Sequence, residues 1–291
     1  MKYRVRHRSH YRYSKQVDLS LHILHLTPRN LPHQRVVSAE IKADPAPAGW
    51  REAADYFGNR LTYLSLVEPH DRFSVELDAC VEVTAPTLPS LGGSPAWDAV
   101  RDSLAAGDGA DWGELVEFVH PSPLAAPNEQ VARYAAEPFQ PGRPLLEAVA
   151  ALNARIYADF TFDPTATDIA TPLAEILENR RGVCQDFAHL AVAACRSMGL
   201  AARYVSGYIR TYRADGGPNF AGADASHAWI SVHCPGTGWV DFDPTNDLIV
   251  GDEHIVLAWG RDYDDVSPIR GVLLGGGGHS LDVAVDVTAV E

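Results

Sequence analysis

Cys184 stands at the head of a segment whose apolar residues recur at helical spacing. In CQDFAHLAVAACRSMGL, residues 184–200, they lie at offsets 0, 3, 4, 7 and 11, and these positions are Phe187, Leu190, Ala191, Ala194 and Met198. Cys184 precedes this stripe, so it lies where the unpaired N–H groups and the helix dipole favour a thiolate. The position indicates a reactive thiol, and a half-exposed structural cysteine is the alternative that the residues alone leave open.

A thiol nucleophile needs a base and a group that orients the base. His227 lies in the strand-like segment HAWISVHC, and Asp243 lies in GWVDFDP. The short connection CPGTG predicts a hairpin, so the two strands are adjacent and an imidazole can meet a carboxylate across them. The residues alone leave other partners open: His120, His189, His233 and Asp241.

The order of the predicted elements indicates an α+β protein. Residues 2–13 and 72–84 alternate between apolar and polar side chains, which is typical of half-buried antiparallel strands. A proline- and glycine-rich segment at 85–95 follows, then several helical segments, then strands from residue 202 onward. We therefore expect an N-terminal antiparallel β domain at 1–90 and a second domain at 91–291. Its core spans about 145–260, and a C-terminal strand at 280–290 pairs with a sheet that the sequence does not identify.

Composition argues against several classes of partner. The formal net charge is −14, which disfavours nucleic acid, although the basic residues Arg4, Arg6 and Arg8 stand close together near the start. No uninterrupted apolar run reaches the roughly 18–20 residues of a membrane span, and the first residues do not form a secretory signal. The four cysteines include no C-x-x-C pair, so we expect neither a zinc site nor a disulfide framework, and we expect a cytoplasmic location.

Several segments together resemble the bacterial transglutaminase-like superfamily. They are RGVCQDFAHLAVAACRSMGLAARYVSGY, GADASHAWISV, GWVDFDPTND and GRDYDDVSPIRG, with DYFGN in the N-terminal strands. The resemblance implies a papain-like core, in which a helix that bears the cysteine packs on an antiparallel sheet, preceded by a small β domain. It also implies a Cys–His–Asp triad of Cys184, His227 and Asp243, and it prefers Asp243 to Asp241 because the family's carboxylate directly precedes Pro-Thr.

The implied chemistry is an acyl-enzyme formed by Cys184 from a protein or peptide amide. Water would resolve it in a protease or amidase, and an amine co-substrate would resolve it in a transglutaminase. The backbone N–H of Cys184 is the expected oxyanion donor. Other residues are candidates for the substrate cleft: Gln185, Tyr208, Tyr212, Trp229 and Trp239.

We expect no required cofactor and no metal. The acidic loop with Asp262, Asp264 and Asp265 is better explained as a solvated turn than as a cation site. A non-catalytic protein-binding module on the same scaffold is the alternative function, and the basic N-terminal strand is its main support. The sequence carries no signal for the oligomeric state.

Overall fold

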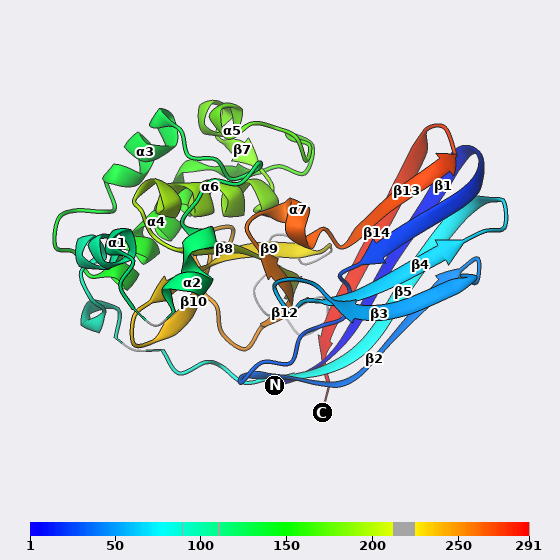
Figure 1. The fold of residues 1–291 in the computed structure, drawn as a ribbon, viewed down its shortest axis with the longest axis horizontal. Helices are drawn as coiled ribbons and strands as arrows, with labels where there is room; N and C mark the ends of the chain where they lie inside the picture. Colours follow the sequence, from blue (N-terminus) through cyan, green and yellow to red (C-terminus); the bar gives the residue numbers. More distant parts are fainter. Residues whose placement is uncertain (89, 110, 212–224, 291) are drawn as a thin grey trace.

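The computed structural model describes residues 1–88, 90–109, 111–211 and 225–290, and it consists of two units side by side (Figure 1). The larger unit joins helices to a five-stranded sheet, and the smaller unit is all β. The helices are α1 (Trp97–Ala106), α2 (Trp112–Leu115), α3 (Glu129–Ala136), α4 (Leu145–Asp159), α5 (Leu173–Asn179), α6 (Cys184–Ser197) and α7 (Tyr263–Val266), with 3-10 turns η1 (Leu91–Gly93) and η2 (Val116–Phe118). The predicted α+β class is confirmed.

The smaller unit is a seven-stranded antiparallel sheet with the order β2-β5-β1-β4-β3, in which β13 and β14 also pair with β1. Its strands are β1 (Lys2–Leu24), β2 (Gln34–Asp44), β3 (Gly49–Ala54), β4 (Arg60–Leu66), β5 (His70–Val83), β13 (Ile269–Gly275) and β14 (His279–Ala289). Alternate residues of β1 from Tyr3 to Ser9 are buried while those between them are exposed or half-buried. The predicted alternation is therefore confirmed.

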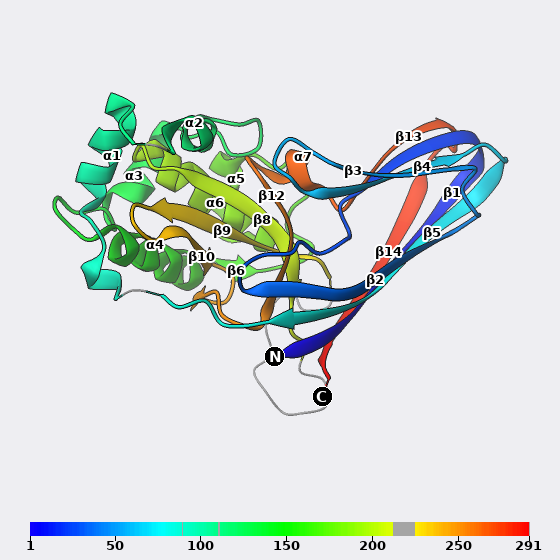
Figure 2. The ribbon, with the colours of Figure 1, turned by 60° about the horizontal axis from the view of Figure 1, so that its bottom comes forward.

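Strand β1 bends and passes from one layer of this unit to another. At the bend, Ser14 N donates to Gly278 O at 2.8 Å and Lys15 N donates to Gly276 O at 3.0 Å. Before the bend β1 pairs with β5 and β14, and after it mainly with β4 and β13, with one further pair to β5 at Val17–His70. The two layers pack on each other, since the ring of His22 stacks on Phe73 with centroids 4.1 Å apart. The unit is thus a folded ribbon with an interior of its own (Figure 2).

The C-terminal strands β13 and β14 belong to the N-terminal sheet. Val285 pairs with His7 and Val287 pairs with Val5, and both valines are buried. The sequence left the partner of the last strand open, and the structure shows that it is β1. Residues 269–289, which the sequence assigned to the second domain, therefore join the sheet of the first one, because β13 and β14 pair with β1 along their length.

The larger unit is built on the antiparallel sheet β11-β10-β9-β8-β12, with a separate two-stranded β6-β7 pair. These strands are β6 (Thr161–Phe162), β7 (Arg181–Gly182), β8 (Ala202–Ile209), β9 (His227–Cys234), β10 (Gly238–Asp243), β11 (Leu248–Ile249) and β12 (His254–Gly260). Helix α6 packs on β9 and β8, while α3, α4 and α5 pack on its other sides (Figure 2). Twelve of its residues are buried, so α6 is a central helix that is buried well beyond the apolar stripe of its sequence.

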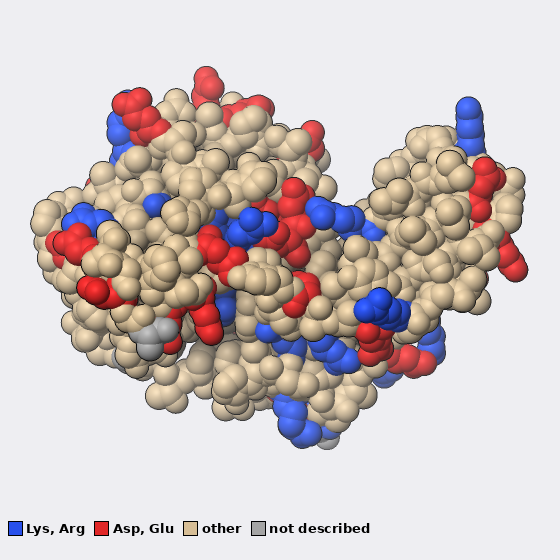
Figure 3. Space-filling model, in the orientation of Figure 1, with Lys and Arg blue, Asp and Glu red and all other residues tan. Residues whose placement is uncertain are grey.

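Helix α5 has Pro172 at its N-cap position, and it ends before Arg180, which has a left-handed φ of 55°. The basic side chains of β1 do not form a free positive stripe, because Arg4 and Arg6 both contact Asp78 on β5. Figure 3 accordingly shows basic and acidic side chains interspersed on the face in view. In the part of the chain that the structure describes, no helix is both long and apolar enough to cross a bilayer.

Candidate active site

A buried carboxylate fixes the entry of the chain into α6, and with it the position of Cys184. Asp186 Oδ2 accepts hydrogen bonds from Val183 N at 2.8 Å and from Thr167 Oγ1 at 2.7 Å. Gly182 makes room for this carboxylate, since a Cβ there would lie 2.6 Å from Asp186 Oδ2. Burial raises the pKa of Asp186.

His227 and Asp243 meet across the predicted hairpin, which is confirmed. His227 is the first residue of β9 and Asp243 is the last residue of β10, and the two strands pair from Gly238–Cys234 to Phe242–Ile230. His227 Nε2 lies 2.8 Å from Asp243 Oδ2. The exposed fractions of the two residues are 1% and 0%, so water does not screen this contact.

Cys184 is the second group, after Asp243, that raises the pKa of the His227 ring. It begins α6 and is 9% exposed, and its side chain is near enough to the imidazole to raise the pKa of the ring, whereas His227 Nδ1 has no hydrogen-bond partner among the described residues. Burial opposes protonation of His227, but the Asp243 carboxylate and the Cys184 sulfur outweigh it and raise the pKa of the ring. The same pairing holds the pKa of Asp243 well below its usual range despite its burial. The structure thus favours an imidazolium between a carboxylate and a thiol.

Asp243 is held by more than one histidine. His254 Nε2 lies 3.1 Å from the same Oδ2 atom, and Asn246 Nδ2 donates to it at 2.8 Å. Thr245 N donates to Oδ1 at 2.9 Å. Sequence reasoning missed His254 because it lies on β12, which is not a neighbour of β10 in the sheet. No local spacing signals that contact.

The alternative partners lie elsewhere. His189 Nε2 accepts from Tyr263 N at 3.1 Å, and burial lowers its pKa to about 4. His233 packs on Trp239, and His120 is an exposed residue. Asp241 accepts a hydrogen bond from Trp229 Nε1 at 2.9 Å. Among these described candidates, only His227 and Asp243 are brought together with Cys184.

The predicted cleft residues are only partly placed as expected. Tyr208 and Trp229, which we expect in the substrate cleft, are fully buried. Tyr208 Oη contacts His7 Nδ1 at 3.0 Å, and Trp229 packs edge-on against His254 at 5.1 Å. Gln185 is half-buried beside the cysteine.

The surroundings of the other two aromatic candidates neither support nor oppose a place in the substrate cleft. Trp239 packs on Phe118 and lies beneath the guanidinium of Arg203. Tyr212 lies outside the described residues.

His227, Asp243 and His254 could hold a metal ion on distance alone, because one ligand atom from each lies within 4.8 Å of the others. Both imidazoles, however, direct Nε2 at the carboxylate oxygen at hydrogen-bonding distance. A metal would need these nitrogens deprotonated and free of that oxygen. The geometry fits a hydrogen-bonded network better than a metal centre. The acidic turn is likewise tied internally, since Asp262 caps α7 and Asp265 binds Arg261.

Comparison with known proteins places both units in one family. Residues 3–82 match the bacterial transglutaminase-like N-terminal region, and residues 132–244 match the transglutaminase-like superfamily core. An uncharacterized protein of Mycobacterium tuberculosis is 41% identical, over 100% of this chain and 93% of its own length. An uncharacterized protein of Mycobacterium leprae is 35% identical, over 98% of each chain.

A solved structure shares the whole fold. The crystal structure of a candidate cysteine protease from Cytophaga hutchinsonii has a TM-score of 0.75 and 20% identity, and the match covers 100% of this chain and 91% of that one. The likeness spans both the β unit and the α+β unit. The chain belongs to the transglutaminase-like superfamily, with the bacterial transglutaminase-like N-terminal region in front of the core.

Proposed function

We propose that this protein is a thiol enzyme that forms a Cys184-linked acyl-enzyme from protein or peptide amides. The observation that carries the proposal is the buried 2.8 Å contact of His227 with Asp243, beside an unpartnered His227 Nδ1 and a Cys184 that contributes to the raised pKa of the ring. An imidazolium beside a cysteine at a helix N-terminus favours the thiolate, which is the nucleophilic form.

In the proposed reaction, the Cys184 sulfur attacks the carbonyl carbon of the amide. The C–N bond then breaks, His227 gives its proton to the departing amine, and a thioester remains on the sulfur. Asp243 keeps Nε2 of His227 protonated and thereby leaves Nδ1 for the sulfur. Water or a second amine next attacks the thioester, with His227 accepting the proton of that nucleophile.

The tetrahedral intermediate needs donors for its oxygen. The first N–H groups of α6 have no intrahelical acceptor, and the backbone N–H of Cys184 is the first of them. Gln185 is adjacent and half-buried, and it is the candidate for a second contact in the cleft. Loss of one oxyanion donor costs a factor of about 10² to 10³ in kcat in other enzymes. We expect Gln185→Ala to reach that range only if its side chain is that donor.

Trapping of the acyl-enzyme is the direct test. The protein is mixed with a peptide library that contains glutamine and backbone amides, and intact-protein mass spectrometry records any added acyl mass. We expect the mass on the parent and not on Cys184→Ala, with Cys80→Ala as the matched control that keeps it. No adduct with any library, while Cys184 remains alkylatable, would contradict the proposal.

The fate of the thioester separates hydrolase from transferase. The trapped species is transferred to buffer with or without a primary amine, and the products are identified by mass. Release of a free acid that amine does not divert indicates a protease or amidase, whereas a new amide bond indicates a transglutaminase. Both outcomes are compatible with the triad, because the triad determines only that a thioester forms.

The non-catalytic alternative loses its main support, since Arg4 and Arg6 are paired with Asp78. It predicts partner capture that depends on Arg8 and is indifferent to Cys184→Ala. A cytoplasmic location remains a proposal that rests on the four free cysteines, which suit a reducing compartment. Cell fractionation with a periplasmic and a cytoplasmic marker tests it.

A further inference from the structure

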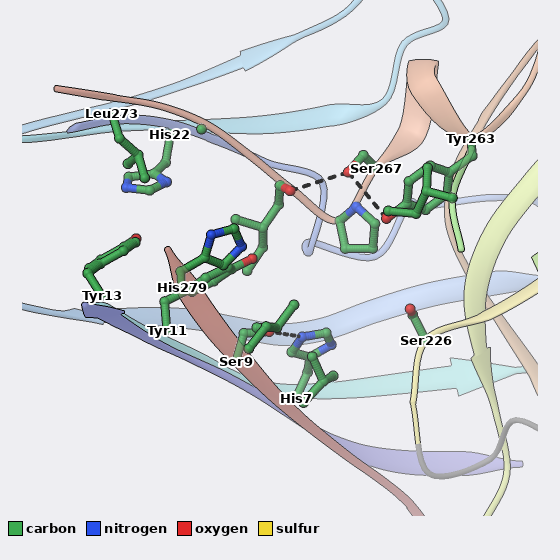
Figure 4. A pocket seen from close by; sticks show the side chains of 16 residues that line it. His7, Ser9, Tyr11, Tyr13, His22, Ser226, Tyr263, Ser267, Leu273 and His279 are labelled. Carbon is green, nitrogen blue, oxygen red and sulfur yellow. Dashed lines mark hydrogen bonds between the residues drawn. The ribbon is translucent and has the colours of Figure 1, made fainter. Parts of the chain in front are cut away.

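A cavity of about 330 Å³ opens between the two layers of the β unit, beside the candidate active site (Figure 4). One wall comes from β1 before its bend and from β14, and includes Tyr11 and Tyr13. The opposite wall comes from β1 after the bend and from β13, and includes His22 and Leu273. The bend of β1 therefore creates this space.

Two residues that line the cavity lie close in sequence to residues of the candidate active site. Ser226, which lines it, directly precedes His227. Ile169 also lines it and lies two residues beyond Thr167, whose hydroxyl holds Asp186 at the start of α6. In Figure 4, Ser226 faces the His7 and Ser9 side chains across the cavity. The cavity thus adjoins the chain segments that lead into His227 and into the start of α6.

The sixteen described residues that line the cavity include no acidic side chain, lysine or arginine, although 21% of the chain is charged. Burial lowers the pKa of His7 and of His22 to about 4, so both are neutral at pH 7. Burial also raises the pKa of Tyr11 to about 12. The cavity offers aliphatic side chains, aromatic rings and neutral hydroxyl groups.

We propose that this cavity is a substrate subsite, which accepts an uncharged apolar or aromatic side chain of the peptide that carries the reactive amide. The inference rests on the proposed function for the identity of the ligand as a peptide. A charged side chain would lose its water here without gaining a counter-ion, which is strongly unfavourable. An aromatic side chain would meet the nearly parallel rings of Tyr11 and Tyr13, whose planes differ by 11°.

The size of the cavity limits what can occupy it. Its volume lies at the lower end of the roughly 300–1,000 Å³ of small-ligand sites. A side chain with a short piece of backbone fits, whereas a folded partner does not. A free apolar small molecule has compatible chemistry, and the experiment below separates it from a peptide.

Binding is measured on Cys184→Ala, so that the result does not depend on turnover. Fluorescent peptides share one central glutamine and differ only in the residue on either side of it, which is Phe, Leu, Glu or Lys. We expect at least about tenfold tighter binding of the Phe or Leu peptides than of the Glu or Lys peptides. Free phenol and toluene serve as competitors. If they bind but no peptide does, the cavity takes small molecules and the proposal is wrong.

A charge swap identifies the cavity as the origin of the preference. Leu273 lines the cavity, whereas its neighbour Val272 is 72% exposed on the other face of β13. Leu273→Glu should shift the preference toward the Lys peptide, and Leu273→Lys toward the Glu peptide. Val272→Glu is the matched control and should leave the preference unchanged. His279 lines the cavity but is exposed, so His279→Glu and His279→Lys repeat the swap if the Leu273 variants unfold at a lower temperature.

The two proposals fail in different ways. Acylation of Cys184 by all four peptides with equal kcat/KM would overturn the subsite while the proposed enzyme stands. A clear binding preference that follows Leu273, without acylation by any peptide, would overturn the enzyme while the subsite stands. Equal responses of the Leu273→Glu and Val272→Glu variants would also refute the subsite.

Discussion

Replacement of Asp243 by asparagine tests the charge state of the candidate site most directly. His227, His254 and Asn246 all donate to Asp243 Oδ2, and the backbone N–H of Thr245 donates to Oδ1. An asparagine side chain has one oxygen and one NH₂ group. In either orientation its NH₂ faces at least one of these donors. Asparagine is therefore not a neutral substitute at this position, although its size is almost the same.

The magnitude follows from burial and charge. Asp243 is fully buried, and the pKa of His227 is raised, so the contact is a buried ion pair. Removal of one partner of such a pair typically costs about 3–5 kcal/mol. A domain has about 5–15 kcal/mol of stability, so we expect Asp243→Asn to fold with a clearly lower urea midpoint. Asp241→Asn is the matched control. Among the described residues, Asp241 accepts one side-chain hydrogen bond, from Trp229, so its replacement should lower the unfolding free energy by less than Asp243→Asn does.

The pH dependence carries the sharper test. Because the pKa of His227 is raised in the folded parent, the pair stabilises fully below the unfolded value of about 6.5 and loses this stability as the pH rises toward the folded value. In Asp243→Asn, burial without a counter-charge lowers the pKa of His227. The unfolding free energy of this variant therefore does not depend on pH through His227 above pH 6.5. The difference in unfolding free energy between parent and variant should therefore narrow by about 1.4 kcal/mol per pH unit between pH 7 and 9.

Cys184 must be removed from both proteins for this measurement. If the sulfur gives its proton to His227 on folding, the thiol loses one proton and the imidazole gains one. The folded and unfolded states then bind the same number of protons, and the unfolding free energy no longer depends on pH through this pair. Both chains are therefore compared in a Cys184→Ala background by urea unfolding at several pH values. Restoring Cys184 to the parent should flatten the slope, which reports the thiolate–imidazolium pair.

A pH-independent difference in the Cys184→Ala background would refute the reasoning. It would mean that His227 is neutral in the folded protein and that Asp243 only orients it. Nitrogen-15 NMR of labelled imidazoles gives the same answer without unfolding. We expect His227 to stay protonated at both ring nitrogens at pH 7.5 in the parent background and to lose one proton in Asp243→Asn.

Three further outcomes are expected. Gly207→Ala should cost about 2–4 kcal/mol in thermal unfolding, because its Cβ would collide with the backbone oxygen of Ile255 and the ring of Trp229. Gly251→Ala is its control, since a Cβ there meets nothing within 4 Å. Since burial lowers the pKa of His189 to about 4, acidification from pH 6.5 should reduce the unfolding free energy by up to about 1.4 kcal/mol per unit, and His189→Gln should remove this part of the slope. Thorough chelation should leave the acylation assay unchanged, and complete loss restored by calcium would contradict the expectation that no metal is required.

Local features of the site could be predicted because they depend on short stretches of chain. The stripe after Cys184 predicts a helix, and α6 begins at that residue. The connection after Cys234 predicts a hairpin, and Gly236 and Gly238 adopt the positive φ values of 78° and 89° that such a turn requires. The helix places Cys184 at its first residue, and the hairpin brings the strand that ends at Asp243 beside the strand that begins at His227.

Long-range features of the site could not be predicted. His254 reaches Asp243 because β12 pairs with β8 at the edge of the sheet, and no spacing near His254 indicates that pairing. Trp229 shares its strand face with the polar residues His227 and Ser231, yet it is fully buried against His254. Period and composition identify which side chains can be buried, whereas the partner that buries them depends on strand order.

The boundary near residue 90 separates residues that act together. Tyr208 of β8 contacts His7 of β1 at 3.0 Å, and His7 in turn contacts Ser9 at 2.8 Å. The backbone N–H of Thr211 donates to Val287 of β14, so the end of β8 is tied to the β unit by main chain as well. The wall of the proposed subsite therefore has its position relative to His227 set by buried contacts between the two units. If the β unit were joined to the core by the connecting chain alone, no contact would hold this wall in one orientation relative to His227. The C-terminal strands β13 and β14 pair with β1, so the β unit is connected to the core by the chain both before and after the core.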